Sequence, residues 1–406
     1  MNAGKAPSGL ALSGLRVLDL SRVLAGPWAT QALGDLGADV VKIEKPGVGD
    51  DTRSWGPPWL ADADGQATGE SAYFLAANRN KRSVAIDIAR PEGQALVRRL
   101  AAQSDVLVEN FKVGALARYG LDYERLSALN PRLVYCSITG FGQDGPDAAR
   151  AGYDFMIQGM SGLMSVTGAP DDEPQKVGVA LIDVLTGLNA AIAVLAAVQQ
   201  RHSTGRGQHI DLALFDVAVA SLANQALNHL VAGTVPRRLG NAHPNIVPYQ
   251  AFATADGHLI LAVGNDGQFA RFGRIAGLAP DARFSTNAGR VAHRDELVPL
   301  VERAMAARST AQWIAVLDGA GIPCGPINDI DQAFAEPQAL ARGLALATPH
   351  AAGVDAPGVR SPLRLGASPF AAVAPPMLGQ HTDEVLTQLL GLSAQDLAGL
   401  RADAII

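Results

Sequence analysis

Asp183 is the residue whose setting most clearly offers chemistry, because it is the single charged residue in the apolar run from Val177 to Val198. The pattern KVGVALID followed by VLTGLNAAIAVLAA predicts an apolar strand that ends at Asp183, where a helix begins. First-turn amides and the helix dipole would then favour ionisation of this carboxylate, whereas apolar walls would oppose it. An ordinary N-cap aspartate fits the pattern. The functional alternative is a carboxylate nucleophile, which converts a thioester into a mixed anhydride without metal or ATP.

A second group of chemically useful residues is basic and lies in the first third of the chain. Lys45 follows the predicted strand Asp39–Glu44, and Lys112 follows the predicted strand Asp105–Glu109. Parallel sheets bind ligands at the carboxyl ends of their strands, so we expect a phosphate-bearing ligand there. Asn110 and Phe111 offer a hydrogen bond and an aromatic face for an adenine, or else a helix cap and a core ring. The rest of the group is Lys42, Arg53, Arg79, Lys81, Arg82 and Arg118.

Other kinds of site find little support in the sequence. Gly140–Gly145 (GFGQDG) matches the dinucleotide pattern GxGxxG, but Pro146 follows and no apolar helix opens there, so we expect a turn and no NAD. The eight histidines lack ligand spacing, which argues against a metal site. A net charge of −6 argues against nucleic acid as a partner. Cys136 and Cys324 lie far apart, which favours a reduced intracellular setting.

Alternating strands and helices must position these residues. Helices are expected at Pro27–Leu36 and Pro91–Gln103, between short apolar strands at Leu15–Leu20, Asp39–Glu44, Ser83–Ile88, Asp105–Glu109 and Leu133–Ile138. Strands that are apolar on both faces predict an α/β fold with a parallel, Rossmann-like sheet covered on both sides. The length of 406 residues and the 48% hydrophobic content allow two or three domains with packed cores.

The rest of the chain predicts a smaller α+β domain and an arm. A helical run is expected from Asp211 to about Ala232, and the ADG turn at Ala255–Gly257 predicts a hairpin. Helices follow at 267–277, 294–307 and 310–319, and the Pro-rich segment Thr348–Pro376 precedes a final helix near Asp383–Leu390. We therefore predict a large domain at 1–228, a connector at 229–247, a small domain at 248–328 and a C-terminal arm at 329–406 that returns to the large domain.

The apolar run Val177–Val198 is nearly long enough to cross a bilayer. It is rich in Gly and Ala and contains Thr186 and Asn189, so we expect a buried strand and helix, and no membrane partner. The first fifteen residues lack the apolar core of a signal peptide and the Arg-rich run of a transit peptide. We therefore expect a cytoplasmic location.

Several blocks in order resemble the class III CoA-transferases, the family of formyl-CoA transferase and carnitine CoA-transferase that also includes α-methylacyl-CoA racemases. They include LRVLDLSRVLAGPWATQALGDLGADVVKIEKPGVGD, ANRNKRSVAIDI, DVLVENFKVGALARYGLDYERLSALNPRLVYCSITGFGQDGP, AGYDFMIQGMSGLMSVTG and TGRGQHIDLALFD, with GIPCGPIND and PPMLGQHT near the end. The resemblance covers nearly the whole chain. It implies two chains threaded through each other as an interlocked homodimer. It also implies a coenzyme A thioester as substrate, with no permanently bound cofactor.

The same resemblance implies roles for individual residues. The family's catalytic aspartate falls on Asp183. Its CoA-contacting positions fall on Leu24, Ala25, Lys45, Ile86, Asn110, Phe111, Lys112, Arg118 and Tyr153. Some members have a lysine where this chain has Ala89, and Arg90 is the neighbouring substitute.

Two alternatives to a transferase are open at this point. The racemase branch uses a histidine in an AGHD block, where this chain has Tyr153, and a glutamate where this chain has Ala253. Both departures remove acid–base groups that α-proton exchange requires, so a transferase is preferred over an isomerase. A non-catalytic CoA-binding protein is the other alternative, and the acid at position 183 speaks against it.

Within the transferases, GNAHPNIVPYQAF, VGVALIDVLTGLNAAIAVLAA and the AEPQ block resemble the branch that moves CoA from succinyl-CoA to glutarate or related dicarboxylic acids. A dicarboxylate acceptor needs a cation for its distal carboxylate, ideally a bidentate arginine. The candidates are Arg53, Arg79 and Arg82, and the sequence does not choose among them.

Overall fold

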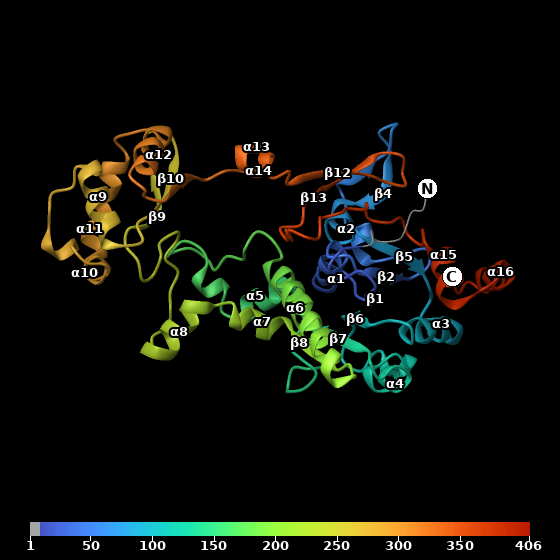
Figure 1. The fold of residues 1–406 in the computed structure, drawn as a ribbon. Coiled ribbons are helices and arrows are strands. Elements are labelled where there is room, and N and C mark those ends of the chain that lie inside the picture. The colour runs from blue at the N-terminus through green and yellow to red at the C-terminus, as the bar shows by residue number, and fades with distance from the viewer. Residues whose placement is uncertain (1–8) are drawn as a thin grey trace. The chain divides into compact units, whose positions relative to one another are not determined.

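The computed structural model describes residues 9–406, which fall into two compact units. The larger unit comprises residues 9–163, 177–226 and 338–406, and the smaller comprises residues 164–176 and 227–337. Figure 1 shows the elements of both units. The domain boundaries predicted from the sequence stay a prediction.

A six-stranded parallel sheet forms the centre of the larger unit (Figure 1). Its strands run in the spatial order β5-β2-β1-β6-β7-β8, and every neighbouring pair is parallel. Counted along the chain within this sheet, the order is third, second, first, fourth, fifth, sixth, which is the doubly wound arrangement. The predicted Rossmann-like sheet is thus confirmed. The strands are β1 (Arg16–Asp19), β2 (Asp39–Glu44), β5 (Lys81–Ala85), β6 (Val106–Glu109), β7 (Val134–Thr139) and β8 (His209–Ala213).

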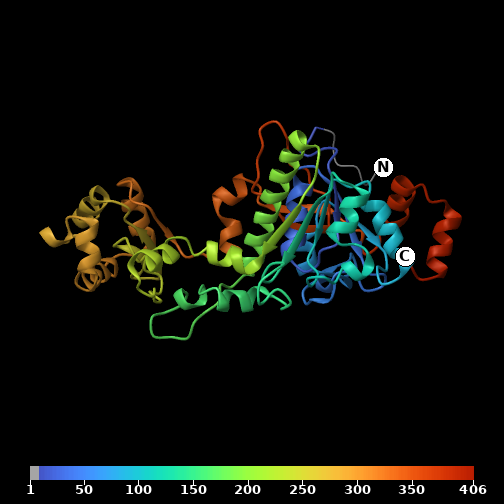
Figure 2. The ribbon, with the colours of Figure 1, turned by 90° about the horizontal axis from the view of Figure 1, so that it is seen from below.

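Helices cover both faces of this sheet because its strands alternate apolar side chains to both sides. Val17 and Val106 pack on one face with α1, α6 and α7, whereas Leu18 and Leu107 pack on the other with α3, α4, α15 and α16. Figure 2 shows the green helix α6 and the cyan helices on opposite sides of the strands. The larger unit's main helices are α1 (Ala25–Asp35), α2 (Ala72–Ala77), α3 (Pro91–Ala101), α4 (Tyr123–Leu129), α5 (Asp154–Met160), α6 (Leu181–Thr204), α7 (Leu214–Ala220), α15 (Thr382–Leu390) and α16 (Ala394–Ala402).

The predicted strand before Asp183 is wrong. Residues 177–180 form no strand, and α6 runs unbroken from Leu181, with Asp183 in its first turn. The sixth place in the sheet belongs instead to β8, whose ladder with β7 pairs Cys136 with Ile210. The helical run expected from Asp211 therefore starts as a strand and continues as α7 and α8 (Ala223–Ala232), with a break at 221–222. The sequence did not indicate this strand because His209 and Asp211 interrupt its apolar pattern. Polar residues of this kind are tolerated in β8 because it is an edge strand, which is solvated on one side.

Two further segments contain more structure than the sequence predicted. The stretch 47–80, for which no helix or strand was predicted, contains the 3₁₀ helix η1 (Asp51–Ser54), the hairpin of β3 (Trp59–Ala61) and β4 (Ala67–Ser71), and helix α2. The arm contains a hairpin of β12 (Ala345–Pro349) and β13 (Asp355–Val359). A further 3₁₀ helix, η2 (Ala117–Tyr119), precedes α4.

The smaller unit is an α+β structure around a three-stranded antiparallel sheet. The predicted hairpin is β9 (Tyr249–Ala253) and β10 (His258–Ala262), and β11 (Cys324–Pro326) pairs with β10. The helices predicted after the hairpin are confirmed within one or two residues. The unit's helices are η3 (Met164–Val166), α9 (Asp266–Ala276), η4 (Ala282–Phe284), α10 (Asn287–Ala292), α11 (Arg294–Met305), α12 (Thr310–Gly319) and α13 (Ile330–Ala335), while α8 and α14 (Pro337–Ala341) contain the unit boundaries.

Helix α6 is the one helix in residues 9–406 that is long and apolar enough to cross a membrane by length and composition. In the structure it packs against α1 and beside β7 and α7, and it buries Thr186, Ala190, Val194 and Arg201. A core helix of a large α/β unit passes the same hydropathy test, and the buried Arg201, paired with Asp105, suits that setting.

Candidate active site

A cavity of about 440 Å³ lies in the larger unit where the strand order reverses, between β1 and β6. Doubly wound sheets bind ligands at this switch point, beyond the carboxyl ends of the strands. Of the residues that the sequence predicted for the site, the cavity brings together Leu24, Ala25, Asn110, Phe111, Lys112, Tyr153 and Asp183. They come from loops after β1 and β6, from the start of α5 and from the first turn of α6.

Asp183 differs electrostatically from the N-cap aspartate that the sequence allowed. The amides of Ile182 and Asp183 donate to Asp154 Oδ1, at 2.7 and 3.2 Å, so Asp154 holds the helix start. Burial raises the pKa of Asp183, and the charge of Asp154 raises it further, to about 7. A carboxylate deprived of hydrogen-bonded stabilisation is a better nucleophile than a capped one, provided that it is ionised.

Two close backbone approaches place Asp183 and Asp154 at the cavity. A Cβ on Gly187, one turn after Asp183, would lie 2.7 Å from the carbonyl oxygen of Ala25, so only glycine lets α6 approach α1 so closely. A Cβ on Gly140 would likewise lie 2.6 Å from Cα of Gly152. Gly140 opens the GFGQDG segment, which forms turns, and the next α-helix is α5 at Asp154. The absence of a side chain at Gly140 and Gly152 thus allows the close backbone contact that places α5 next to the end of β7.

A second cavity of about 370 Å³ shares Arg22, Asp51 and Phe111 with the first. It is lined by the remaining predicted residues, Lys45, Ile86 and Arg118, and by Ala89. Lys45 and Arg118 are exposed cations, whereas the Ile86 side chain is buried in the core. Arg90, the proposed substitute for the missing lysine, does not line this cavity and instead sits at the N-cap of α3. The first cavity thus contains the Asp183 carboxylate, and the second has Lys45 and Arg118 in its lining.

Asn110 and Phe111 have more specific roles than the sequence indicated. The Asn110 side chain accepts from the amide of Arg22 at 2.9 Å and donates to the carbonyl of Arg22 at 2.7 Å, which ties the β6 loop to the β1 loop. The Phe111 ring lies under the Arg22 guanidinium, 5.2 Å from its Cζ, and borders both cavities. Asn110 therefore shapes the site with its side chain.

The three arginines proposed for a distal carboxylate are engaged inside the protein. Arg53 binds Glu44 and Glu70, Arg79 binds Asp35, and Arg82 makes three hydrogen bonds to Asp39. None of the three lines either cavity. The prediction that one of these three arginines holds the distal carboxylate of the acceptor is therefore wrong. It failed because a sequence shows the cations without showing the acids that pair with them.

Sequence reasoning missed several residues that line or support the site. Arg22 and Arg150 carry the guanidiniums of the Asp183 cavity, alongside the ammonium of Lys112. Arg22 pairs with Asp51 at 3.0 Å and Arg150 with Asp147 at 3.0 Å, both with about half of the arginine side chain exposed. Asp154 was also missed, although its position next to Tyr153 in the AGYD block was a signal that could have indicated it.

This fold and this acid-bearing cavity define a CoA-transferase of family III. The model of that family, CoA-transferase family III, matches residues 12–382, so the chain belongs to it. A succinate–glutarate CoA-transferase from Agrobacterium fabrum is 52% identical over 93% of this chain and 95% of its own length. The human succinyl-CoA:glutarate CoA-transferase is 42% identical over 97% of this chain and 90% of its own.

A solved structure agrees with the fold. The crystal structure of a CAIB/BAIF family protein from Brucella suis is 50% identical and superposes with a TM-score of 0.83, covering 94% of this chain and 100% of that chain. The resemblance inferred from the sequence blocks is confirmed, as is the assignment to the transferase type.

Proposed function

We propose that this protein transfers CoA from succinyl-CoA to glutarate or a related dicarboxylate, with Asp183 as the nucleophile. The observation that carries this proposal is the Asp183 carboxylate in the wall of a cavity shared with Leu24, Ala25, Asn110, Phe111, Lys112 and Tyr153. The names of relatives at 42% and 52% identity supply the substrate class. Tyr153 and Ala253 in place of acid–base groups speak against the racemase alternative.

The proposed reaction needs only the substrates and one carboxylate. An Asp183 oxygen attacks the thioester carbonyl carbon, the carbon–sulfur bond breaks, and a mixed anhydride and CoA thiolate result. The thiolate then attacks the aspartyl carbonyl, which gives an aspartyl–CoA thioester and releases the donor acid as its carboxylate. The acceptor carboxylate reverses both steps. Each step exchanges one acyl bond for another, so no metal, ATP or net hydrolysis is required.

The cavities support the placement of the two ends of the substrate. Lys45 and Arg118 border the second cavity and offer positive charge to the phosphates of CoA, while the thioester would reach the first cavity and Asp183. A second carboxylate on the acceptor requires a cation near Asp183, and the cations of that cavity are Arg22, Lys112 and Arg150.

The test is to mix the protein with succinyl-CoA and a panel of mono- and dicarboxylates, and to separate the thioesters formed by chromatography. We expect glutaryl-CoA from glutarate, and a loss of at least about a thousandfold in turnover with Asp183→Asn. The matched control is Asp211→Asn, which changes an acid that does not line the cavity. Undiminished turnover by Asp183→Asn would exclude the nucleophile, and activity with monocarboxylates or carnitine alone would exclude the substrate class.

We also propose the setting in which this chemistry occurs. Coenzyme A enters as a thioester substrate, with no permanently bound cofactor, and the enzyme acts in the cytoplasm as an interlocked homodimer. Leu188 and Ile192 on α6 support the association of two chains, because they expose 42% and 66% of their surface one helical turn apart.

A further inference from the structure

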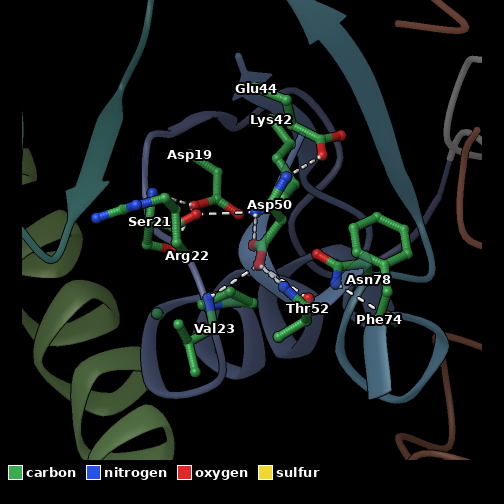
Figure 3. Close-up of polar contacts among 12 residues, drawn as sticks. Asp19, Ser21, Arg22, Val23, Lys42, Glu44, Asp50, Thr52, Phe74 and Asn78 are labelled. Carbon is green, nitrogen blue, oxygen red and sulfur yellow. Dashed lines mark hydrogen bonds and ion pairs between the residues drawn. The ribbon is translucent and has the colours of Figure 1, made fainter. Parts of the chain in front are cut away.

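The loop between β1 and α1 lines both cavities and is held almost entirely by side chains from elsewhere. Figure 3 shows its contacts with Asp19, Lys42 and Asp50. The amide of Ser21 donates to Asp19 at 2.9 Å, and its carbonyl accepts from Lys42 Nζ at 2.8 Å. The amide and the carbonyl of Arg22 both bind Asn110, and the amide of Val23 donates to Asp50 Oδ1 at 3.2 Å. Five successive backbone groups of the loop thus depend on four buried or half-buried side chains.

Val23 is the strained member of this loop. Its φ is +70°, a left-handed conformation that is a genuine outlier for a β-branched residue. Such strain persists only where the surroundings over-determine the backbone, and it is common where a chain is shaped for a ligand. Val23, Leu24 and Ala25 line the Asp183 cavity directly after this point, so the left-handed residue sets the direction in which the backbone enters the cavity wall.

The group that holds Val23 is a fully buried ion pair. Lys42 Nζ lies 2.9 Å from Asp50 Oδ2, and both side chains have 0% exposure. Asp50 Oδ1 accepts from Val23, and also from the amide and the hydroxyl of Thr52. Both members of the pair thus bind the backbone of the loop, Lys42 at the Ser21 carbonyl and Asp50 at the Val23 amide (Figure 3).

The pair stays charged across the working pH range. Burial opposes ionisation of Asp50, but Lys42 and the hydrogen bonds from Thr52 outweigh it and lower the pKa of Asp50 to about 2. Burial also opposes the charge of Lys42, yet Asp50, Asp19 and Glu44 raise the pKa of Lys42. A buried ion pair is weak evidence for stability, since apolar residues of similar volume often serve as well. What apolar residues cannot supply is the pair of oriented hydrogen bonds to the loop.

We propose that Lys42 and Asp50 are positioning residues that hold the Ser21–Ala25 loop in the shape that binds acyl-CoA. Lys42 fixes the Ser21 carbonyl and Asp50 fixes the left-handed Val23, although neither residue is needed as a reacting group. This inference rests on the proposed function, because it takes coenzyme A as the ligand of the two cavities.

The test compares full-length variants that remove the charge while keeping or losing the acceptor. In Lys42→Met/Asp50→Asn the amide oxygen can still accept from Val23, whereas in Lys42→Met/Asp50→Ala it cannot. We expect the second variant to bind coenzyme A about tenfold more weakly than wild type in calorimetric titration, and the first to lose less. Adding Val23→Gly to the alanine variant should recover at least about threefold, because glycine adopts the left-handed conformation without strain.

The control variant is Asp105→Ala, which breaks the ion pair with the buried Arg201 on another part of the sheet. It should lower the thermal unfolding midpoint without changing the affinity for coenzyme A. If the alanine variant at Asp50 also lost only thermal stability, or if Val23→Gly gave no recovery, the pair would be merely structural and the proposal would be overturned.

Hydrogen exchange on the wild-type protein provides a measurement that needs no variant. The Val23 amide should be protected to a similar extent as the Leu20 amide, which donates to the Val108 carbonyl at the edge of the ladder. Rapid exchange of Val23 would contradict the proposed tether. Coenzyme A binding and acyl transfer are separate measurements, so a wild-type protein that binds coenzyme A tightly but transfers nothing would exclude the proposed function and leave the positioning role standing.

Discussion

At the residue scale, two aspartates share the roles that the sequence offered for Asp183 alone. Asp154 caps the start of α6, and Asp183 is the carboxylate at the cavity. Asp154 takes the first amides of α6, and Asp183 is left half-buried with a pKa of about 7. The pKa of Asp183 in the folded protein lies above the ordinary value of 3.8. The free energy of unfolding should therefore fall as the pH rises from about 4 to 7, because in this range the carboxyl ionises more readily in the unfolded protein. The site thus keeps a carboxylate that gains from being acylated, since acylation removes its charge.

The pH dependence of transfer should report this carboxylate. We expect kcat/KM for succinyl-CoA to rise with pH up to about 7 and then level off, because only the ionised Asp183 attacks. Asp154→Asn removes the neighbouring charge but keeps an oxygen for the helix amides, so the rising limb should move to lower pH by about one unit. The measurement is the pH profile of both proteins under the same ionic strength.

The control for this profile is Asp122→Asn, which removes an acid that pairs with the exposed Arg125 and lines a different part of the surface. Its profile should match that of wild type. If the rising limb of kcat/KM falls at the same pH in Asp154→Asn as in wild type, burial alone sets the pKa of Asp183.

The sequence revealed individual residues more reliably than their partners. Asp183 was found because it is the one charged residue in a long apolar run, where a carboxylate is unfavourable unless it has a structural or functional role. Arg53, Arg79 and Arg82 were misjudged because Glu44, Asp35 and Asp39 lie on other strands and helices, and pairing across a sheet has no local signature. Asn110 was found as a site residue, but its hydrogen bonds to the backbone of Arg22 depend on which strands are neighbours.

At the element scale, the contact between α1 and α6 places Asp183, the proposed nucleophile, beside the β1 loop. Helix α6 packs extensively on α1, and Gly187 lies directly against the Ala25 carbonyl and the Trp28 side chain. Both helices pack on the same face of the sheet through Ala29, Ala190 and Val194. Small side chains allow a short interaxial distance, so any added volume at the crossing must displace the first turn of α6.

Gly187→Ala should therefore destabilise the protein and impair transfer. The added Cβ meets the Ala25 carbonyl oxygen, and we expect a loss of about 1–3 kcal/mol in unfolding free energy that outweighs the gain of about 1 kcal/mol in helix propensity. A drop in kcat at saturating substrate should accompany it, since Asp183 lies one turn away. Urea unfolding and steady-state kinetics check both parts.

Gly399→Ala is the matched control, because Gly399 lies within α16 and nothing stands within 4 Å of an added Cβ. This variant should gain up to about 1 kcal/mol in stability and keep full activity. Equal behaviour of the two glycine variants would show that the helix crossing tolerates a methyl group.

Elements with a strong apolar pattern were predicted well, and elements at edges were not. β1, β2, β6 and β7 are buried on both faces and matched their predicted ranges within one or two residues. β8 carries two polar residues and has a neighbour on one side alone, so its sequence resembles a helix start. The hairpin of β12 and β13 contains two prolines, Pro349 and Pro357, which disfavour a strand assignment from sequence.

At the scale of the whole molecule, the exposed apolar face of α6 bears on assembly. Leu188 and Ile192 lie on a helix whose opposite face is buried on α1, so this surface faces away from the larger unit's own core. Large apolar side chains that stay exposed on a long helix are typical of an interface between chains. The association of two copies would remove it from water.

If the protein forms the proposed homodimer through this face, Ile192→Arg should shift it towards the monomer, because a guanidinium would be buried without a partner at the interface. Size-exclusion chromatography with light scattering, over a dilution series, measures this shift. Leu129→Arg is the control, since Leu129 is 56% exposed at the end of the short helix α4. A wild-type protein that runs as a monomer would contradict the predicted homodimer directly.

The buried charges under the β1 loop have a consequence for the order in which the molecule is made. Asp19, Ser21, Lys42, Asp50, Thr52 and Lys81 all belong to the first fifth of the chain, and their mutual bonds need nothing that is synthesised later. Asn110 and Asp183 arrive afterwards. A ribosome therefore delivers the buried ion pairs Lys42–Asp50 and Lys81–Asp19 before it delivers Asp183.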